Sequence, residues 1–333
     1  MSQRIPPDPF LPSGATGAAL AARLSERLAG SLAHLLEACA PHVALDPGAI
    51  AVQIARIAAT PRLRPDLFAL HQEILRAAQR GDRAAIQAGF AELCASPVAA
   101  SPGLALRGWG GTGFSPGEAA RFLRIFGEED DTRVVFGPPA PAMLAAAAAA
   151  LTEASALLAR AAPTLHAEIH ALVSEIILAA NAAPEGMSFD GVTAFHAQGA
   201  LLLNAAELRS PPAALATLVH EAAHALLFAV TEGAPLAENG PEERFASPLR
   251  PDPRPMNGLC HACFVSARMV HALDHAGAAF APEDQAEARR LRDGAWRAHQ
   301  AADAVIRAHG RLTAPGAAFL GAARRHMAAA APG

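Results

Sequence analysis

The residues whose types and spacing can do metal chemistry lie at 220–224, in the order His220-Glu221-Ala222-Ala223-His224. This is a HEXXH motif. On an α-helix, side chains four residues apart project from the same face, so both imidazoles can reach one divalent metal ion while Glu221 lies on the flank of that face. The spacing therefore predicts a metal site at His220 and His224.

The residues around the motif predict that it lies on a buried helix. Ser210-Pro211-Pro212 is a helix-start signal, and Thr231-Glu232-Gly233 ends the helical run. A HEXXH sequence also arises by chance, and two histidines can be ordinary residues of a polar helix face. Here apolar residues occupy nearly all sides, and buried His and Glu side chains need partners, so we favour the metal site.

A catalytic metal needs a third protein ligand and open positions for substrate or solvent. The sequence offers His261, the pair Glu242 and Glu243, and the pair Cys260 and Cys263. The glutamates follow Gly-Pro in a polar segment, where a solvated charge is the simpler interpretation, and the cysteines lack the second pair that a zinc ribbon requires. His261 alone can equally be a ligand or a histidine near a helix start.

Two further histidine pairs and two arginines have suggestive spacing. His166 with His170 and His271 with His275 are four residues apart, which is also common on helix surfaces. Arg250 and Arg254 lie in a proline-rich loop, where a guanidinium can bind a carboxylate with two parallel hydrogen bonds.

Hydrophobic periodicity predicts a mainly α fold, α+β with a few short strands next to the metal helix. We expect a helical N-terminal region with a flexible arm at 1–140 and a HEXXH metal-binding domain at 141–333. Helices are predicted at 18–40, 50–59, 67–80, 83–94, 116–126, 141–161, 163–182, 211–230, 258–275 and 281–310. Strands are predicted at 133–136, 187–191 and 199–204, and loops at 99–117 and 232–257.

Composition narrows the classes of partner. The chain has 333 residues, is 52% hydrophobic and carries a net charge of -4 with no basic stripe, which argues against binding to nucleic acid. The four cysteines are too few and too scattered for a secreted disulfide scaffold. We see no apolar signal core and no stretch that looks like a membrane-spanning helix, and we expect a cytoplasmic protein that does not bind membranes.

Several segments in this order resemble one known family. They are Leu203-Asn204 at the end of a short strand, Leu218-Val219-His220-Glu221-Ala222-Ala223-His224, the run Ser247-Pro248-Leu249-Arg250-Pro251-Asp252-Pro253-Arg254-Pro255, and Gly258-Leu259-Cys260-His261. Together they are similar to the HEXXH-domain family of bacterial peptide-modifying proteins, described as 2-oxoglutarate-dependent HEXXH-type peptide beta-hydroxylases. The proline- and arginine-rich run is the more specific part, and the resemblance covers roughly 188–275.

The resemblance implies an Fe(II) site held by His220, His224 and His261, with 2-oxoglutarate and O2 as co-substrates. It implies that Arg250 or Arg254 binds the distal carboxylate of 2-oxoglutarate, and that Glu221 orients a water or His220. The implied activity is beta-hydroxylation of a residue in a ribosomally synthesised precursor peptide.

Two alternatives stay open. In a zinc metallopeptidase of the HEXXH type, Glu221 is the general base that activates zinc-bound water. In a helical adaptor that binds a leader peptide, the metal is structural or vestigial. A hydroxylase needs His261 and a carboxylate-binding arginine, whereas a peptidase needs Glu221 and tolerates the loss of Arg254.

Overall fold

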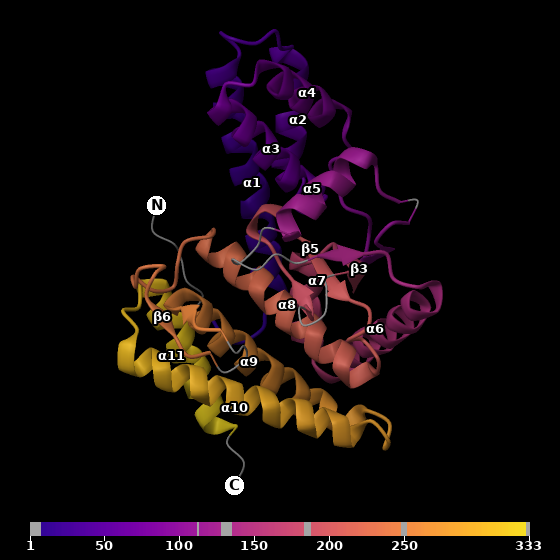
Figure 1. Cartoon of the computed structure of the whole chain (residues 1–333), viewed down its shortest axis with the longest axis vertical. Helices are drawn as coiled ribbons and strands as arrows, with labels where there is room; N and C mark the ends of the chain where they lie inside the picture. The colour runs from indigo at the N-terminus through magenta and orange to yellow at the C-terminus, as the bar shows by residue number, and fades with distance from the viewer. Residues whose placement is uncertain (1–7, 112, 128–134, 183–187, 248–251, 331–333) are drawn as a thin grey trace. The chain divides into compact units, whose positions relative to one another are not determined.

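A computed structural model describes residues 8–111, 113–127, 135–182, 188–247 and 252–330 (Figure 1). The protein is 65% helical, with a few short strands, which confirms the predicted mainly α class. The helices of the described residues are α1 Gly14–Cys39, α2 Pro47–Ala59, α3 Asp66–Arg80, α4 Arg83–Ala95, α5 Pro116–Gly127, α6 Pro141–Ala161, α7 Pro163–Leu172, α8 Pro211–Thr231, α9 Met256–Ala276, α10 Gln285–His309 and α11 Ala314–Ala329.

The strands form two small sheets. They are β1 Ala105–Gly108, β2 Phe136–Gly137, β3 Glu175–Asn181, β4 Gly191–Val192, β5 Ala200–Asn204, β6 Arg244–Phe245 and β7 Arg254–Pro255. In the larger sheet β3 lies between β1 and β5 and runs parallel to both, β4 pairs antiparallel with β5, and β2 pairs with the end of β3. In the smaller sheet β6 pairs antiparallel with β7.

Several predictions of secondary structure were wrong. The helix predicted at 163–182 ends at Leu172 and is followed by β3. The loop predicted at 99–117 contains β1, and the loop predicted at 232–257 contains β6, β7 and the start of α9. The strand predicted at 187–191 overlaps β4 only at Gly191. Residues 175–179 are all buried, because β1 and β5 flank β3. An apolar run buried on both faces carries no period of two, so it cannot be told from a buried helix by its sequence pattern.

The chain divides into two compact units, which we describe separately. The first comprises residues 1–16, 145–169 and 206–333, and the second comprises residues 17–144 and 170–205. In the second unit α3 packs against α4 and α5, and the strands β3 and β5 contribute buried residues to its core. An apolar cluster built around Leu32, Ile57, Leu67, Phe90 and Leu93 fills the space between its N-terminal helices.

In the first unit α9 is the central element, packed against α8, α10 and α11 (Figure 1). Most residues of α8 and α9 are buried, which follows from their apolar sequences. Two helices, α6 and α8, are long and apolar enough to cross a membrane by length and composition alone, contrary to our expectation of none. The apolar window of α8 is 78% buried, as in the core helix of a folded unit, and that of α6 is 28% buried.

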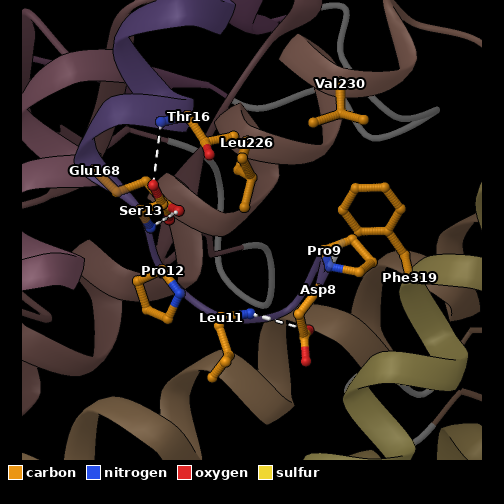
Figure 2. Close-up of a pocket in the computed structure, with 10 residues that line it drawn as sticks. All are labelled: Asp8, Pro9, Leu11, Pro12, Ser13, Thr16, Glu168, Leu226, Val230 and Phe319. Carbon is orange, nitrogen blue, oxygen red and sulfur yellow. Dashed lines mark hydrogen bonds between the residues drawn. The ribbon is translucent and has the colours of Figure 1, made fainter. Parts of the chain in front are cut away.

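A buried arginine fixes the N-terminal segment, residues 8–13, to the helices of the first unit. Arg268 of α9 forms an ion pair with Glu168 of α7, and its Nη1 donates a hydrogen bond to the Phe10 carbonyl at 2.6 Å. Glu168 also accepts a hydrogen bond from the Ser13 amide at 2.9 Å. Figure 2 shows this segment curving along one side of a cavity of about 240 Å³, with Leu226 and Val230 of α8 on the other side.

Replacing Arg268 by methionine should lower the free energy of unfolding by about 3 kcal/mol, because Glu168 would keep a buried charge without its partner. The measurement is urea denaturation followed by circular dichroism. The exposed Arg297 on α10 provides the control, since Arg297→Met should change stability by less than about 0.5 kcal/mol. Equal effects of the two substitutions would contradict the role given to Arg268.

Candidate metal centre

Helix α8 carries the HEXXH motif, as predicted, and both of its ends have clear local causes. The Ser210 side chain caps the first turn by accepting a hydrogen bond from the Ala213 amide, and prolines occupy the first two helical positions. The same hydroxyl donates to Glu287 of α10 at 2.6 Å, which ties the start of α8 to its neighbour. Glu232 ends the helix in the left-handed conformation, with a φ of 54°.

Three imidazoles meet where α8 packs against α9. The Nε2 atoms of His220 and His224 are 3.2 Å apart, and the Nδ1 atoms of His224 and His261 are 3.1 Å apart. The structure thus brings His261, one of the three candidate third ligands, into direct contact with the motif. Phe228, one turn after His224 on α8, lies beside His261 with ring centroids 5.5 Å apart and closes the apolar side of the cluster.

Desolvation keeps these imidazoles neutral, most fully at His261, which is buried, while His220 and His224 are half-buried. Desolvation lowers the pKa of His220 to about 4 and that of His261 to about 4, with the positive charge of Arg254 adding to the effect at His261. The pKa of His224 is lowered well below its ordinary value by burial and by its two histidine neighbours. Neutral imidazole is the form that binds a metal, so at pH 7 no proton has to leave the site.

Glu221 is buried beside the cluster, with 4% of its surface exposed. Its Oε1 lies 3.9 Å from the Nε2 of His220. That separation is longer than a hydrogen bond but close enough for the carboxylate charge to act on the imidazole. Glu221 therefore lies on the flank of the histidine face, where the helical spacing places it.

Arg254 approaches the cluster from the loop side. It lies in β7, directly before α9, and its guanidinium passes over the first turn of that helix beside Gly258. A methyl group on Gly258 would lie 3.3 Å from the Arg254 Nε, so a larger residue there would crowd the arginine. Burial lowers the pKa of Arg254, which nevertheless stays charged at neutral pH. Arg250, the other predicted carboxylate-binding residue, lies outside the described residues.

The loop after α8 is anchored, and Glu243 is engaged in that anchoring. Glu243 pairs with Arg311 at 2.6 Å and accepts a hydrogen bond from the Gly240 amide at 2.7 Å. These contacts hold the pKa of its carboxyl at about 2. The neighbouring Glu242 is exposed. Glu243 therefore stabilises the loop. Of the candidate third ligands, His261 is the one that contacts His224.

The two cysteines that flank His261 face the other helices of the unit. The Cys263 Sγ is 3.4 Å from the Nδ1 of His299 on α10, and both cysteines are fully buried. Burial raises the pKa of Cys260 to about 12, so its thiol is protonated at neutral pH. This fits the interpretation of Cys260 and Cys263 as small buried residues.

The remaining histidine pairs lie elsewhere. His166 of α7 is 3.4 Å from the Ser155 hydroxyl of α6. His271 and His275 of α9 meet His326 of α11, which lies 55 residues further along the chain than His271. The sequence spacing identified the first two members of this second cluster, but nothing in it pointed to His326.

The three imidazoles are suitable ligands for a divalent transition metal, but their nitrogens do not point toward one common position. Imidazole nitrogen suits Fe, Zn, Cu and Ni ions, and three neutral rings leave further coordination positions open. His224 faces His220 with one nitrogen and His261 with the other, and in the part of the chain that the structure describes no three His, Cys, Asp or Glu side chains surround one point. Rotation of a ring about its Cβ–Cγ bond, a soft torsion, is needed for convergence.

Comparisons with known proteins add no family assignment. No protein-family model matches the chain, and no curated protein sequence matches it. The resemblance to the HEXXH-domain family of peptide-modifying proteins therefore stays a prediction.

The metal-free protein should lose stability as the pH falls from 7 to 5. His261 is 8% exposed and has a pKa of about 4 when folded, against about 6.5 when unfolded, so between these values the unfolded chain binds the extra proton. This imidazole alone should cost about 1–2 kcal/mol over that interval.

Denaturation in the presence of a chelator at several pH values tests this expectation. His261→Asn should reduce the pH dependence, whatever its effect on stability at pH 7. The exposed His34 of α1 supplies the matched control, and His34→Asn should leave the dependence unchanged. An identical pH dependence in wild type and His261→Asn would mean that His261 is not desolvated.

Proposed function

We propose that the protein is an Fe(II)- and 2-oxoglutarate-dependent hydroxylase that acts on a ribosomally synthesised precursor peptide, at the beta carbon of one residue. The observation that carries the proposal is the contact of His261 with His224 of the HEXXH motif, with the Arg254 charge acting on His261. The precursor peptide as substrate and 2-oxoglutarate as co-substrate follow from the resemblance to the HEXXH-domain family.

In this proposal His220, His224 and His261 hold the metal. Bound Fe(II) supplies the O2 chemistry by which the co-substrate is decarboxylated to succinate and CO2 and one oxygen atom is transferred to the peptide. Three neutral imidazoles leave the charge of the ion uncompensated. The site therefore attracts an anionic ligand such as a 2-oxo acid.

Arg254 is placed to bind the second carboxylate of such a ligand and so to orient it. Its guanidinium lies beside the first turn of α9, where Gly258 has no side chain to crowd it, and its charge is close enough to His261 to lower the pKa of that imidazole. A dicarboxylate with one end at the metal ligands needs a cationic fork for its other end, and a half-buried arginine pairs with a carboxylate more strongly than an exposed one. Arg250 stays a second candidate for this role.

Glu221 has a supporting part in this scheme. Its buried carboxylate, near the His220 ring, is suited to orient that imidazole or a water molecule. The zinc metallopeptidase is the alternative, with Glu221 as general base. The pairing of Glu243 with Arg311 removes one candidate third ligand of a peptidase. The half-buried Arg254 beside His261 has no part in peptide hydrolysis, so both observations favour the hydroxylase.

Replacing Arg254 by alanine should raise the concentration of 2-oxoglutarate needed for half-maximal activity by roughly 10- to 100-fold, as expected for loss of a charge-assisted carboxylate contact. The iron content of the protein should not change. The measurement is succinate formation against 2-oxoglutarate concentration, together with iron quantification. Arg244→Ala, at an exposed arginine of the partner strand β6, is the control.

Unchanged dependence on 2-oxoglutarate in Arg254→Ala would remove Arg254 from this role. If wild type forms no succinate at all but cleaves peptides with zinc, and Glu221→Gln abolishes that cleavage, the metallopeptidase alternative is correct instead.

A further inference from the structure

The second histidine cluster lies in the first unit, where α9 packs against α11. His271 and His275 are one turn apart on α9, and their ring centroids are 4.3 Å apart. His326 of α11 completes the group, with its ring centroid 5.0 Å from that of His271. None of these residues belongs to the candidate metal centre described above.

The spacing of two of the nitrogens suits a metal ion. The Nδ1 of His271 and the Nε2 of His326 are 3.3 Å apart. Two imidazole nitrogens bound tetrahedrally to Zn²⁺ at about 2.0–2.1 Å from the ion lie about 3.3–3.4 Å from each other. A direct hydrogen bond between nitrogens at this separation is long and therefore weak.

His275 is the candidate third donor. Its Nδ1 lies 2.8 Å from the His271 carbonyl oxygen, a contact that the ring gives up when it turns toward the ion. His275 is exposed, so its ring can turn without disturbing the core.

Charges of both signs surround the cluster. The carboxylates of Asp274 and Asp8 act against the lowering of the His326 pKa by burial, and Asp274 is itself paired with Arg292 at 2.8 Å. Burial and the neighbouring charges lower the pKa of His271 to about 3, so its imidazole is neutral at pH 7. Arg268 opposes cation binding, but its charge is paired with Glu168.

We propose that His271, His275 and His326 form a second metal site, which takes Zn²⁺ or a similar divalent transition ion. The arrangement of the described side chains does not yet close around one point, so the exposed His275 ring turns when the ion binds. Water fills the remaining position.

The site is connected to the N-terminal segment. The Phe10 ring lies against the His326 ring with centroids 4.4 Å apart, and Arg268 holds the Phe10 carbonyl. An ion that fixes His326 also fixes the surface on which Phe10 packs. The second site is therefore structural, and it stabilises the docking of this segment on α9 and α11.

Equilibrium dialysis against Zn²⁺ tests the proposal in a His224→Ala/His261→Ala background, which removes the first centre. This background protein should bind one Zn²⁺ per chain. Adding His326→Ala or His275→Ala should weaken that binding at least tenfold, whereas His34→Ala should not change it. Circular dichroism of each variant reports folding, and His275→Ala, at an exposed position, keeps the test valid if His326→Ala does not fold.

Two results would overturn the proposal. One is a background protein that binds no Zn²⁺, and the other is Zn²⁺ binding that His275→Ala leaves unchanged. Because the first centre is absent from these proteins, the outcome is independent of whether the chain is a hydroxylase.

Discussion

The candidate site depends on the packing of three neutral imidazoles between two apolar helices, with His261 buried and His220 and His224 half-buried. A desolvated imidazole needs partners for its ring nitrogens, and His224 contacts both His220 and His261. Such an arrangement is costly for a helix pair whose only role is packing, since aliphatic residues would fill the same volume without polar atoms to satisfy. The proposed divalent ion would bind these three imidazoles, and on that proposal it accounts for polar side chains at this position.

Hydrogen bonds around the cluster tie α8 to α10 and the intervening loop to α9. Ser210 joins the start of α8 to α10, and Asn257 in the first turn of α9 accepts a hydrogen bond from the Leu236 amide of the intervening loop at 2.7 Å. The Leu236 carbonyl in turn approaches Gly316 of α11 so closely that a side chain at Gly316 would collide with it. The loop that carries Arg254 is thereby held at both ends, which places the arginine beside His261 without a contribution from the ligand.

Local patterns in the sequence predicted the parts of this site that depend on one helix. The spacing of His220 and His224 and the capping residues Ser210 and Pro211 are local, and the structure places them as expected. The choice of His261 over Glu243 depends on how α9 packs on α8, which no local pattern encodes. The same limit explains β3, whose residues 175–179 read equally as helix until their neighbours β1 and β5 are known, and His326, which reaches His271 only through tertiary packing.

The central claim is that His220, His224 and His261 bind one metal ion together. X-ray absorption spectroscopy of the protein loaded anaerobically with one equivalent of Fe(II) tests it most directly, because imidazole ligands give a distinct multiple-scattering pattern. The account predicts three imidazole ligands in the wild type and two in His261→Ala, with weaker iron binding in the variant. A wild-type spectrum with two imidazoles or fewer, or one that His261→Ala leaves unchanged, would contradict it.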